Sequence, residues 1–244
     1  MLSKGGIMKV AIIFAAGIGS RLQPISNNVH KSLIKFKGLT LIEHIINHLI
    51  EIHDLKKIIV ITGHLKDEFN FLTNKYSKLI LINNQHFLDY NSGYALTLVS
   101  SYFNGQDDIF IISGDMISTK NIFLNNFSTN MMAAINRDHD NIKEDWSYKL
   151  NKDGNIIDII KSKKKDSFLA GEWSYITKKW AKVIGEDLIN QQQELVLQTT
   201  MIGKYLISNS IKHNFELKPY VLSFVCHWDV DNIIDLERTN KYFK

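Results

Sequence analysis

Residues 8–35, MKVAIIFAAGIGSRLQPISNNVHKSLIK, constrain the fold of this chain more than any other stretch. They begin with an apolar run at 10–14, which predicts a central strand that is buried on both faces. The run ends in AAGIGS at 15–20, where small residues allow a backbone to approach a ligand closely. Arg21 follows directly, and Lys31 comes ten residues later. A strand, a small-residue turn and two cations predict a polyphosphate site, because the turn offers N–H groups and the cations offset phosphate charge.

Two familiar phosphate-binding motifs do not fit this stretch. A Walker loop closes with Gly-Lys-Ser/Thr, whereas this turn closes with Gly19-Ser20-Arg21. A dinucleotide fingerprint needs a third glycine and an acidic residue about twenty positions further on. Leu22 occupies the position of that glycine, and residues 35–39 contain no acid. The stretch therefore argues against an oxidoreductase that binds a dinucleotide.

Predicted strands and helices alternate through the first half of the chain. KIIVIT at 57–62 and KLILIN at 78–83 are typical of buried strands. LIEHIINHLIEI at 41–52 predicts an amphipathic helix, and Thr40 with Glu43 has the spacing of a capping box. This alternation predicts an α/β fold with a Rossmann-like, doubly wound and mostly parallel sheet.

Two polar turns in this half follow predicted strands. Asn91-Ser92-Gly93 is a turn that can cap a helix starting near Tyr94. Its backbone groups could read the edge of a base or a phosphate, and a plain loop is the alternative. Residues 109–112 predict a strand, and Asp115 lies just beyond its carboxyl end, the edge where open α/β sheets bind ligands. A carboxylate facing a triphosphate would repel it unless a cation lies between them, so Asp115 is a candidate Mg²⁺ ligand. The alternative is a solvated acid in a turn.

Beyond about residue 130 the pattern changes from alternating units to hairpin-like segments. Residues 146–161 read as two strands around the turn at 151–155, and residues from about 175 to 210 look largely helical. We therefore expect residues 1–244 to form a single domain, with a nucleotide-binding half at about 8–130. A smaller β-hairpin and helix elaboration at about 131–244 would bind the second substrate.

Aromatic and basic residues of the second half are candidates for that second substrate. All four tryptophans lie there, and rings of this kind can hold a quaternary ammonium group. Trp146 and Trp173, with Tyr148, are the rings we expect to contact it, although packing in the core is the commoner use of tryptophan. Lys161 begins the basic run KSKKK and could bind a substrate phosphate, with a solvated loop as the alternative.

Two acids end the last predicted strand. In Trp228-Asp229-Val230-Asp231 the two acids lie two positions apart, just before the last predicted helix. We expect one to face the site and the other to cap the following helix. The acid that faces the site would complete a Mg²⁺ site with Asp115.

The composition describes an ordinary soluble globular chain. Of the 244 residues, 45% are hydrophobic and 22% are charged, and the net charge of +4 is spread along the chain, which does not argue for nucleic acid. No apolar run reaches the ~18 residues of a spanning helix, so we expect no membrane insertion. The lone Cys226 cannot form an internal disulfide, which suits a reducing compartment. These features predict a cytoplasmic protein.

Residues 8–35 resemble the signature of the nucleotidyltransferase superfamily, G-x-G-[ST]-R-[LM]-x-P-x-[ST] followed by P-K-x-L. His30 stands where the family usually has proline, and Asn232 replaces threonine where residues 229–236 resemble the family's metal-binding D-x-D-T-x-x-D-L. The matching residues of the first motif are Gly17, Gly19, Ser20, Arg21, Leu22, Pro24, Ser26, Lys31 and Leu33.

Within the superfamily, the chain is most similar to bacterial choline-phosphate cytidylyltransferases, through GHLKDEF at 63–69, FLDYNSGYALTLV at 87–99 and DIIKSKKKDSFLAGEWSY at 158–175. The resemblance implies Mg²⁺-dependent transfer of CMP from CTP to a phosphorylated acceptor such as phosphocholine or a related phospho-amine or phosphonate, with release of pyrophosphate. The alternatives are a sugar-1-phosphate nucleotidylyltransferase and a catalytically silent nucleotide-binding regulatory subunit. The sequence does not decide which nucleotide base is preferred or whether the chain forms a homodimer.

Together the motifs and the resemblance predict a set of site residues. The catalytic candidates are Arg21, Lys31 and Asp115. The nucleotide-binding candidates are Ala15, Ala16, Gly17, Ile18, Gly19, Ser20, Arg21, Lys31, Asn91, Ser92 and Asp115. The acceptor-binding candidates are Trp146, Tyr148, Lys161 and Trp173, and the metal candidates are Asp115, Asp229 and Asp231.

Overall fold

The computed structural model describes residues 7–136, 144–164, 167–223 and 225–242. The apolar run of the opening motif is its central strand, and Val10, Ala11, Ile12 and Ile13 are at most 2% exposed. This strand has a parallel neighbour on each side, as predicted. The parallel strands of the first half are, in spatial order, β5 (Leu79–Asn83), β4 (Leu55–Thr62), β1 (Lys9–Ala15) and β6 (Asp108–Ser113).

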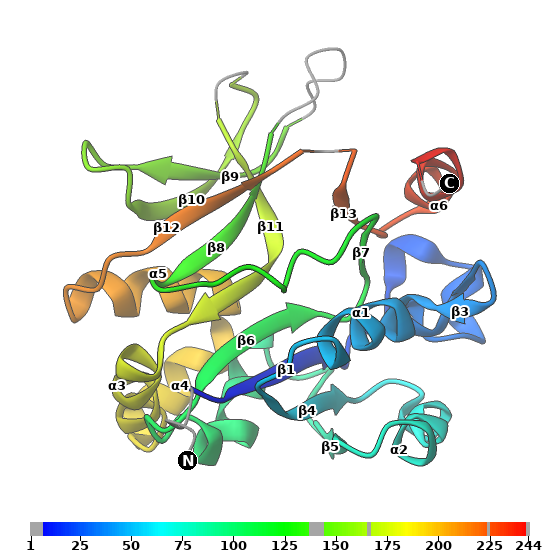
Figure 1. Cartoon of the computed structure of the whole chain (residues 1–244), viewed down its shortest axis with the longest axis horizontal. Helices are drawn as coiled ribbons and strands as arrows, with labels where there is room; N and C mark the ends of the chain where they lie inside the picture. The colour runs from blue at the N-terminus through cyan, green and yellow to red at the C-terminus, as the bar shows by residue number, and fades with distance from the viewer. Residues whose placement is uncertain (1–6, 137–143, 165–166, 224, 243–244) are drawn as a thin grey trace, which may run out of the picture.

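The second half of the chain extends this sheet with antiparallel strands. β11 pairs antiparallel with β6, so the described residues form one nine-stranded mixed sheet, and the predicted fold class is confirmed (Figure 1). β9 and β10 form the predicted hairpin beyond β11, while β12 pairs in parallel with β8. These strands are β8 (Met131–Ile135), β9 (Asp145–Leu150), β10 (Ile156–Ser162), β11 (Leu169–Ile176) and β12 (Lys218–Leu222).

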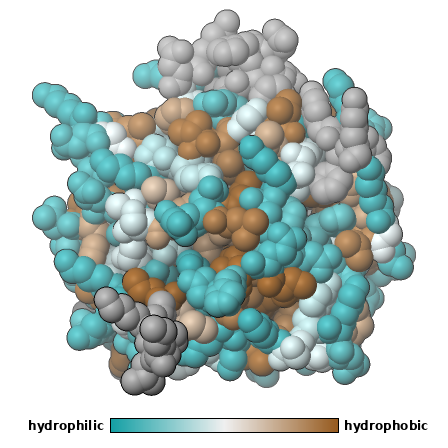
Figure 2. Space-filling model, viewed as in Figure 1, coloured by the Kyte–Doolittle hydropathy of each residue, from teal (hydrophilic) through white to brown (hydrophobic). Residues whose placement is uncertain are grey.

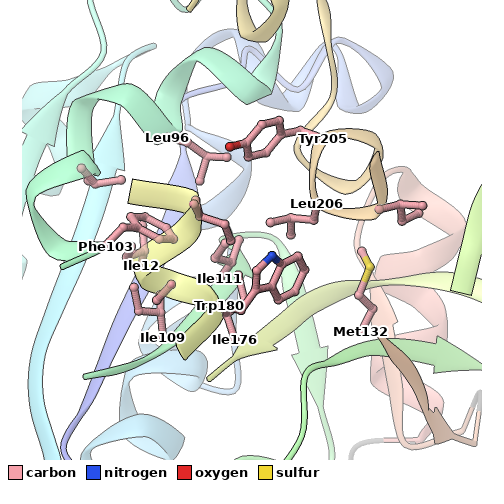
Figure 3. Close-up of a cluster of buried hydrophobic side chains, with 14 of the residues drawn as sticks. Ile12, Leu96, Phe103, Ile109, Ile111, Met132, Ile176, Trp180, Tyr205 and Leu206 are labelled. Atoms are coloured by element: carbon pink, nitrogen blue, oxygen red, sulfur yellow. The ribbon is translucent and has the colours of Figure 1, made fainter. Parts of the chain in front are cut away.

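Helices cover both faces of the sheet, as a doubly wound fold requires. The alternation of β1 sends Ile12 to a core with Trp180 and Tyr205, and sends Ile13 to a separate core with Ile42 and Leu72 (Figures 1 and 3). The first face therefore carries α3 (Lys178–Leu188), α4 (Gln191–Thr199) and α5 (Ile202–Lys212), and the second carries α1 (Leu41–Ile50) and α2 (Phe71–Lys75).

Two local predictions can be compared with the structure. Thr40 and Glu43 form the predicted capping box at the start of α1. The helix predicted from about Tyr94 is instead a 3₁₀ helix at Ser92–Tyr102, and Val99 interrupts it with φ −119° and ψ 15°. Asn91 accepts the first N–H bond of that segment, as a capping residue does.

A small pair of strands brings the two halves together beside β1. β7 (Met116–Ser118) and β13 (His227–Asp229) are antiparallel, and Asp229 pairs with Met116. Trp228, on β13, is 2% exposed and donates its indole N–H to Thr239 Oγ1 of α6 (Ile233–Tyr242) at 3.0 Å. Two further short strands, β2 (Lys35–Phe36) and β3 (Leu39–Thr40), form a separate hairpin.

The surface is mixed in character. Figure 2 shows polar residues over much of one face, with apolar residues among them near its centre. Of the helices that the structure describes, none combines the length and the apolar character needed to cross a bilayer.

Candidate active site

A cavity of about 320 Å³ lies where the two halves meet. Residues from the phosphate-loop motif, from the ends of β1 and β6, from β9 and β11, and from the segments around β13 and the start of α5 line it. It lies at the carboxyl ends of the central parallel strands, the edge at which open α/β sheets bind ligands. The residues predicted from sequence that line it are Arg21, Ser92, Trp146, Tyr148, Trp173, Asp229 and Asp231.

The small-residue turn after β1 leaves its backbone accessible. Gly19 has φ 69°, in the left-handed region that favours glycine, and its carbonyl accepts from Ser26 Oγ at 2.8 Å. Gly17, Ile18 and Ser20 are exposed, and a side chain at Gly17 would meet no atom within 4 Å. Among the described residues, no acceptor contacts the N–H groups of Gly17, Ile18 or Gly19. The turn therefore presents unused donors to the cavity side of the sheet.

The two predicted cations lie beside this turn and contact predicted acids. The Arg21 side chain is 72% exposed, and its Nη2 lies 2.7 Å from Asp231 Oδ2. The Lys31 ammonium donates to Asp115 Oδ2 and lies 3.9 Å from Asp231 Oδ1. Burial opposes the charge of Lys31, yet Asp115 and then Asp231 raise its pKa above the ordinary value. Arg21, Lys31, Asp115 and Asp231 thus form one network.

His30, which departs from the family motif, helps to position Lys31. Burial, and secondarily the charge of Lys31, lower the pKa of His30 to about 4, so the imidazole is neutral. Its Nδ1 accepts from the N–H of Ser32 at 3.1 Å and caps the 3₁₀ turn Lys31–Leu33. The substitution for proline therefore leaves Lys31 directed at Asp115.

Four carboxylates gather at the cavity: Glu172, Asp229 and Asp231 line it, and Asp115 interacts with them. Asp115 is 2% exposed and accepts from the hydroxyl of Ser113. Burial opposes the ionisation of Asp115, but Lys31 holds its pKa below the ordinary value. Burial raises the pKa of Asp229 well above its usual range, and Glu172 and Asp231 raise it further. Burial and then Asp115 raise the pKa of Glu172 to about 7. The site concentrates negative charge, as a cation site does before its cation binds.

The expectation for the two acids after the last strand is wrong in one respect. Neither acid caps α6, because Asn232 Oδ1 accepts from Ile234 N at 2.9 Å and from Asp235 N at 3.2 Å. Val230 N donates to the backbone carbonyl of Asp115 at 3.0 Å, which continues the pairing of β13 with β7, and residues two apart on an extended chain share a face. Asp229 and Asp231 consequently both line the cavity.

Glu172 is a site residue that the sequence reasoning missed. It lies on β11, lines the cavity and interacts with the hydroxyl of Ser113, next to Asp115. It belongs to no motif, and an isolated acid in a predicted strand is ordinarily solvated. Only the antiparallel pairing of β11 with β6, Trp173 opposite Ile112, brings it to the end of the parallel strands.

The turn at Asn91–Gly93 is held by the helices of the second half. Asn91 N donates to Gln198 O at 2.7 Å, and Gly93 N donates to Thr200 O at 2.9 Å. Ser92 N donates to Asn91 Oδ1, so the backbone donors expected to read a base or a phosphate already have acceptors. This corrects that expectation, although the Ser92 side chain still lines the cavity and accepts from Ile202 N at 3.2 Å.

The structure separates the two tryptophans expected to bind the acceptor. Trp173 borders the cavity but is 2% exposed, and its ring packs against aromatic side chains of the core that lies under α1. β11 alternates, so Glu172 faces the cavity while the Trp173 ring faces that core. We assign the Trp173 ring to the core, which corrects the expected pair of rings. Its ring neighbours, at centroid distances of 5.3–6.3 Å, are Phe110, Phe123, Phe127 and Tyr220.

Trp146, Tyr148 and Lys161 remain together at the outer wall. Trp146 and Tyr148 both line the cavity from β9. The Lys161 ammonium, on the neighbouring strand β10, lies 5.6 Å from the centroid of the Trp146 ring. These three expected acceptor residues therefore share one region.

The acids can be tested against the metal that they imply. The described residues include no group of three or more histidine, cysteine or acidic side chains already arranged around a metal position. Mg²⁺, however, is usually held by one or two carboxylates together with substrate phosphates and water. Asp115 with Asp229 or Asp231 supplies that donor set, so the residues fit the ion.

Comparison with known proteins identifies cytidylyltransferases as similar to this chain. The chain is 28% identical over 237 residues to the choline-phosphate cytidylyltransferase of Streptococcus pneumoniae, covering 96% of this chain and 98% of that one. It is 34% identical to the choline-phosphate cytidylyltransferase of Haemophilus influenzae, over 61% of each chain. A solved structure of the CTP:phosphocholine cytidylyltransferase from Streptococcus pneumoniae matches with a TM-score of 0.81 at 25% identity, covering 98% of this chain and 100% of the other.

A third relative, at 31% identity over 62% of this chain and 60% of its own, is the 2-aminoethylphosphonate cytidylyltransferase of Lancefieldella rimae. Residues 10–163, which run from the phosphate-loop strand to the basic run, match the nucleotidyl transferase family. The chain belongs to the nucleotidyl transferase family.

Proposed function

We propose that this chain transfers CMP from CTP to a small phosphorylated acceptor, such as phosphocholine or a related phospho-amine or phosphonate, and releases pyrophosphate. The observation that carries the proposal is the ion-pair network of Arg21, Lys31, Asp115 and Asp231, which reaches the cavity through Arg21 and Asp231 and lies beside a turn with unused N–H donors. The cytidylyl class is supported by the relatives, which act on choline phosphate or 2-aminoethylphosphonate.

The chemistry needs no protein nucleophile. An oxygen of the acceptor phosphate is already anionic at neutral pH, so it can attack the α-phosphorus of CTP directly. The new P–O bond forms as the bond between the α-phosphorus and the bridging oxygen breaks, and pyrophosphate leaves with that electron pair. Catalysis then depends on positioning and on neutralising charge.

Each residue of the network has a part in that neutralisation. The turn at residues 15–20 binds phosphate oxygens through its N–H groups, and Arg21 and Lys31 contact the same phosphates. Asp231, which holds both cations before substrate binds, keeps them near the turn. Mg²⁺ held by Asp115 with Asp229 or Asp231 would offset the charge that develops on the phosphates.

The proposal is tested by pyrophosphate release. The purified chain is supplied with Mg²⁺, with each of four nucleoside triphosphates, and with a panel of phosphocholine, 2-aminoethylphosphonate, other phospho-amines and sugar 1-phosphates. We expect turnover with CTP and an amine acceptor. If sugar 1-phosphates outperform every amine, the acceptor assignment is wrong. If no pair is turned over, the chain is not an enzyme of this class.

A further inference from the structure

Trp146 is flanked by two lysines, of which only Lys161 was expected from sequence. The second is Lys204, in the first turn of α5, and its ammonium also lies 5.6 Å from the centroid of the Trp146 ring. α5 packs against β10, the strand that carries Lys161. Two cations from separate elements therefore meet at one ring on the wall of the cavity.

Neither lysine has an acidic partner in the part of the chain that the structure describes. The acid next to Trp146 in sequence, Asp145, accepts the backbone N–H of Trp146 at 2.7 Å. Like charges repel, so two ammonium groups gathered without a counterion favour an anion between or beside them. The Trp146 ring is therefore an unfavourable site for a cationic head group, because the two ammonium groups would repel a third cation.

The position of Lys204 is itself unfavourable for the helix. The N-terminal end of an α-helix carries partial positive charge, so a lysine in the first turn is normally destabilising. The N-cap residue Met201 offers no capping side chain, Ser92 Oγ accepts only the first N–H of α5, that of Ile202, and Met201, Ile202 and Gly203 line the cavity. The helix end and the lysine therefore add positive potential to the same wall.

A buried donor lies beside these cations. Tyr148 is 5% exposed and lines the cavity on the same strand as Trp146; the backbone of Gly171 approaches its hydroxyl oxygen, and the hydroxyl proton has no acceptor among the described residues. Burial, and secondarily Glu172, raise the pKa of Tyr148, which keeps the hydroxyl protonated as a donor. Buried polar groups are rarely left without partners, so an orphaned donor at a cavity wall indicates a ligand.

We propose that Lys161 and Lys204, on the Trp146 wall with the Tyr148 hydroxyl, bind the phosphoryl or phosphonyl group of the acceptor, and that Trp146 is not the seat of its cationic head group. This rests on the proposed function, which supplies an acceptor with such a group. Two ammonium donors and a phenol suit a tetrahedral dianion, because charge-assisted hydrogen bonds to phosphate oxygens are stronger than neutral ones. Lys204 thus becomes a specificity-determining residue.

The test measures KM and kcat of the full chain with CTP, Mg²⁺ and phosphocholine. Lys204→Gln should raise the acceptor KM about tenfold or more, as expected when a charged hydrogen bond is lost, and leave the KM for CTP unchanged. Lys161→Gln should act in the same way, and Lys204→Arg should restore most of the affinity. Lys163→Gln, in the same basic run, is the matched control and should have no effect. An acceptor KM within twofold of wild type for Lys204→Gln overturns the proposal.

A second acceptor separates the phosphate from the head group. In 3,3-dimethylbutyl phosphate, carbon replaces the nitrogen of phosphocholine at similar size. If the lysines bind the phosphoryl group, Lys204→Gln raises KM for both acceptors by a similar factor. A rise for phosphocholine alone would show that Lys204 acts on the head group, and the proposal would fail. Thermal unfolding of Lys204→Gln should match or exceed that of wild type, since the lysine opposes the helix dipole.

A failure of the proposed function can be distinguished from a failure of this anion site. If wild type turns over no acceptor, calorimetry with inorganic phosphate alone tests the same wall. Binding to wild type that Lys161→Gln and Lys204→Gln each weaken, while Lys163→Gln does not, supports an anion site in a protein of other activity. Equal binding by all four proteins, or no binding, overturns the site itself.

Discussion

Replacing Glu172 with glutamine should make the folded protein more stable at alkaline pH. The pKa of Glu172 is raised from 4.5 to about 7, because the half-buried side chain is poorly solvated and lies next to Asp115. Each pKa unit corresponds to about 1.4 kcal/mol, so ionising this group costs the folded state about 3 kcal/mol. Glutamine keeps the shape and has no charge to bury.

The direction in which the free energy of unfolding changes with pH depends on which state, folded or unfolded, holds the Glu172 proton. An unfolded chain releases the Glu172 proton near pH 4.5, whereas the folded chain holds it until about pH 7. Raising the pH through this window favours the unfolded state, so the stability of wild type falls between these values and stays lower above pH 7. The free energy of unfolding of Glu172→Gln, relative to wild type, should rise by about 3 kcal/mol across the same window.

Urea unfolding between pH 4.5 and 8, without divalent cations, measures this difference. Mg²⁺ added at pH 8 should stabilise wild type more than the variant, because the cation offsets a charge that the variant lacks. A difference in unfolding free energy that does not change with pH would refute the reasoning. It would mean that Glu172 is solvated and does not belong to the acidic cluster.

Three further substitutions test other parts of the account. Asp115→Asn should lower turnover by orders of magnitude with unchanged circular dichroism, and near-normal Mg²⁺-dependent pyrophosphate release would remove Asp115 from the catalytic network. Arg21→Ala should lower turnover by a similar factor for every accepted nucleotide, whereas a changed base preference at retained rate would contradict a role on the phosphates. Gly185→Ala should destabilise the fold by about 1–3 kcal/mol in urea unfolding, since its Cβ would lie 1.9 Å from Phe103 O. Gly203→Ala, whose Cβ would approach only Met132 Cε at 3.7 Å, is the control and should be neutral or stabilising.

Local patterns in the sequence predicted the elements that depend on local physics. The buried strand at 10–14, the capping box at Thr40 and Glu43, and the hairpin around 151–155 all appear in the structure, because each depends on residues close in sequence. The phosphate-loop motif also predicted that Arg21 and Lys31 would lie beside the small-residue turn. These two cations lie there because both follow the same strand within a few turns of chain.

Residues whose direction depends on tertiary pairing could not be assigned in advance. Glu172 and Trp173 are neighbours on one strand, and only the packing of the sheet decides which of them faces the cavity. Asp229 and Asp231 reach the cavity because β13 pairs with β7, and Val230 N extends that pairing by donating to Asp115 O, more than a hundred positions earlier. Lys204 carries no signal in sequence, because a lysine on a helix is ordinarily solvated.

The central claim is that an oxygen of the acceptor phosphate attacks the α-phosphorus of CTP in this cavity. Incubating the chain with CTP, Mg²⁺ and phosphocholine labelled with ¹⁸O in its phosphoryl group tests it most directly, with the products analysed by mass spectrometry and ³¹P NMR. The account predicts cytidylylated choline phosphate that retains the label, including at the bridging oxygen, and unlabelled pyrophosphate. Label in pyrophosphate, or the absence of a cytidylylated product, would contradict it.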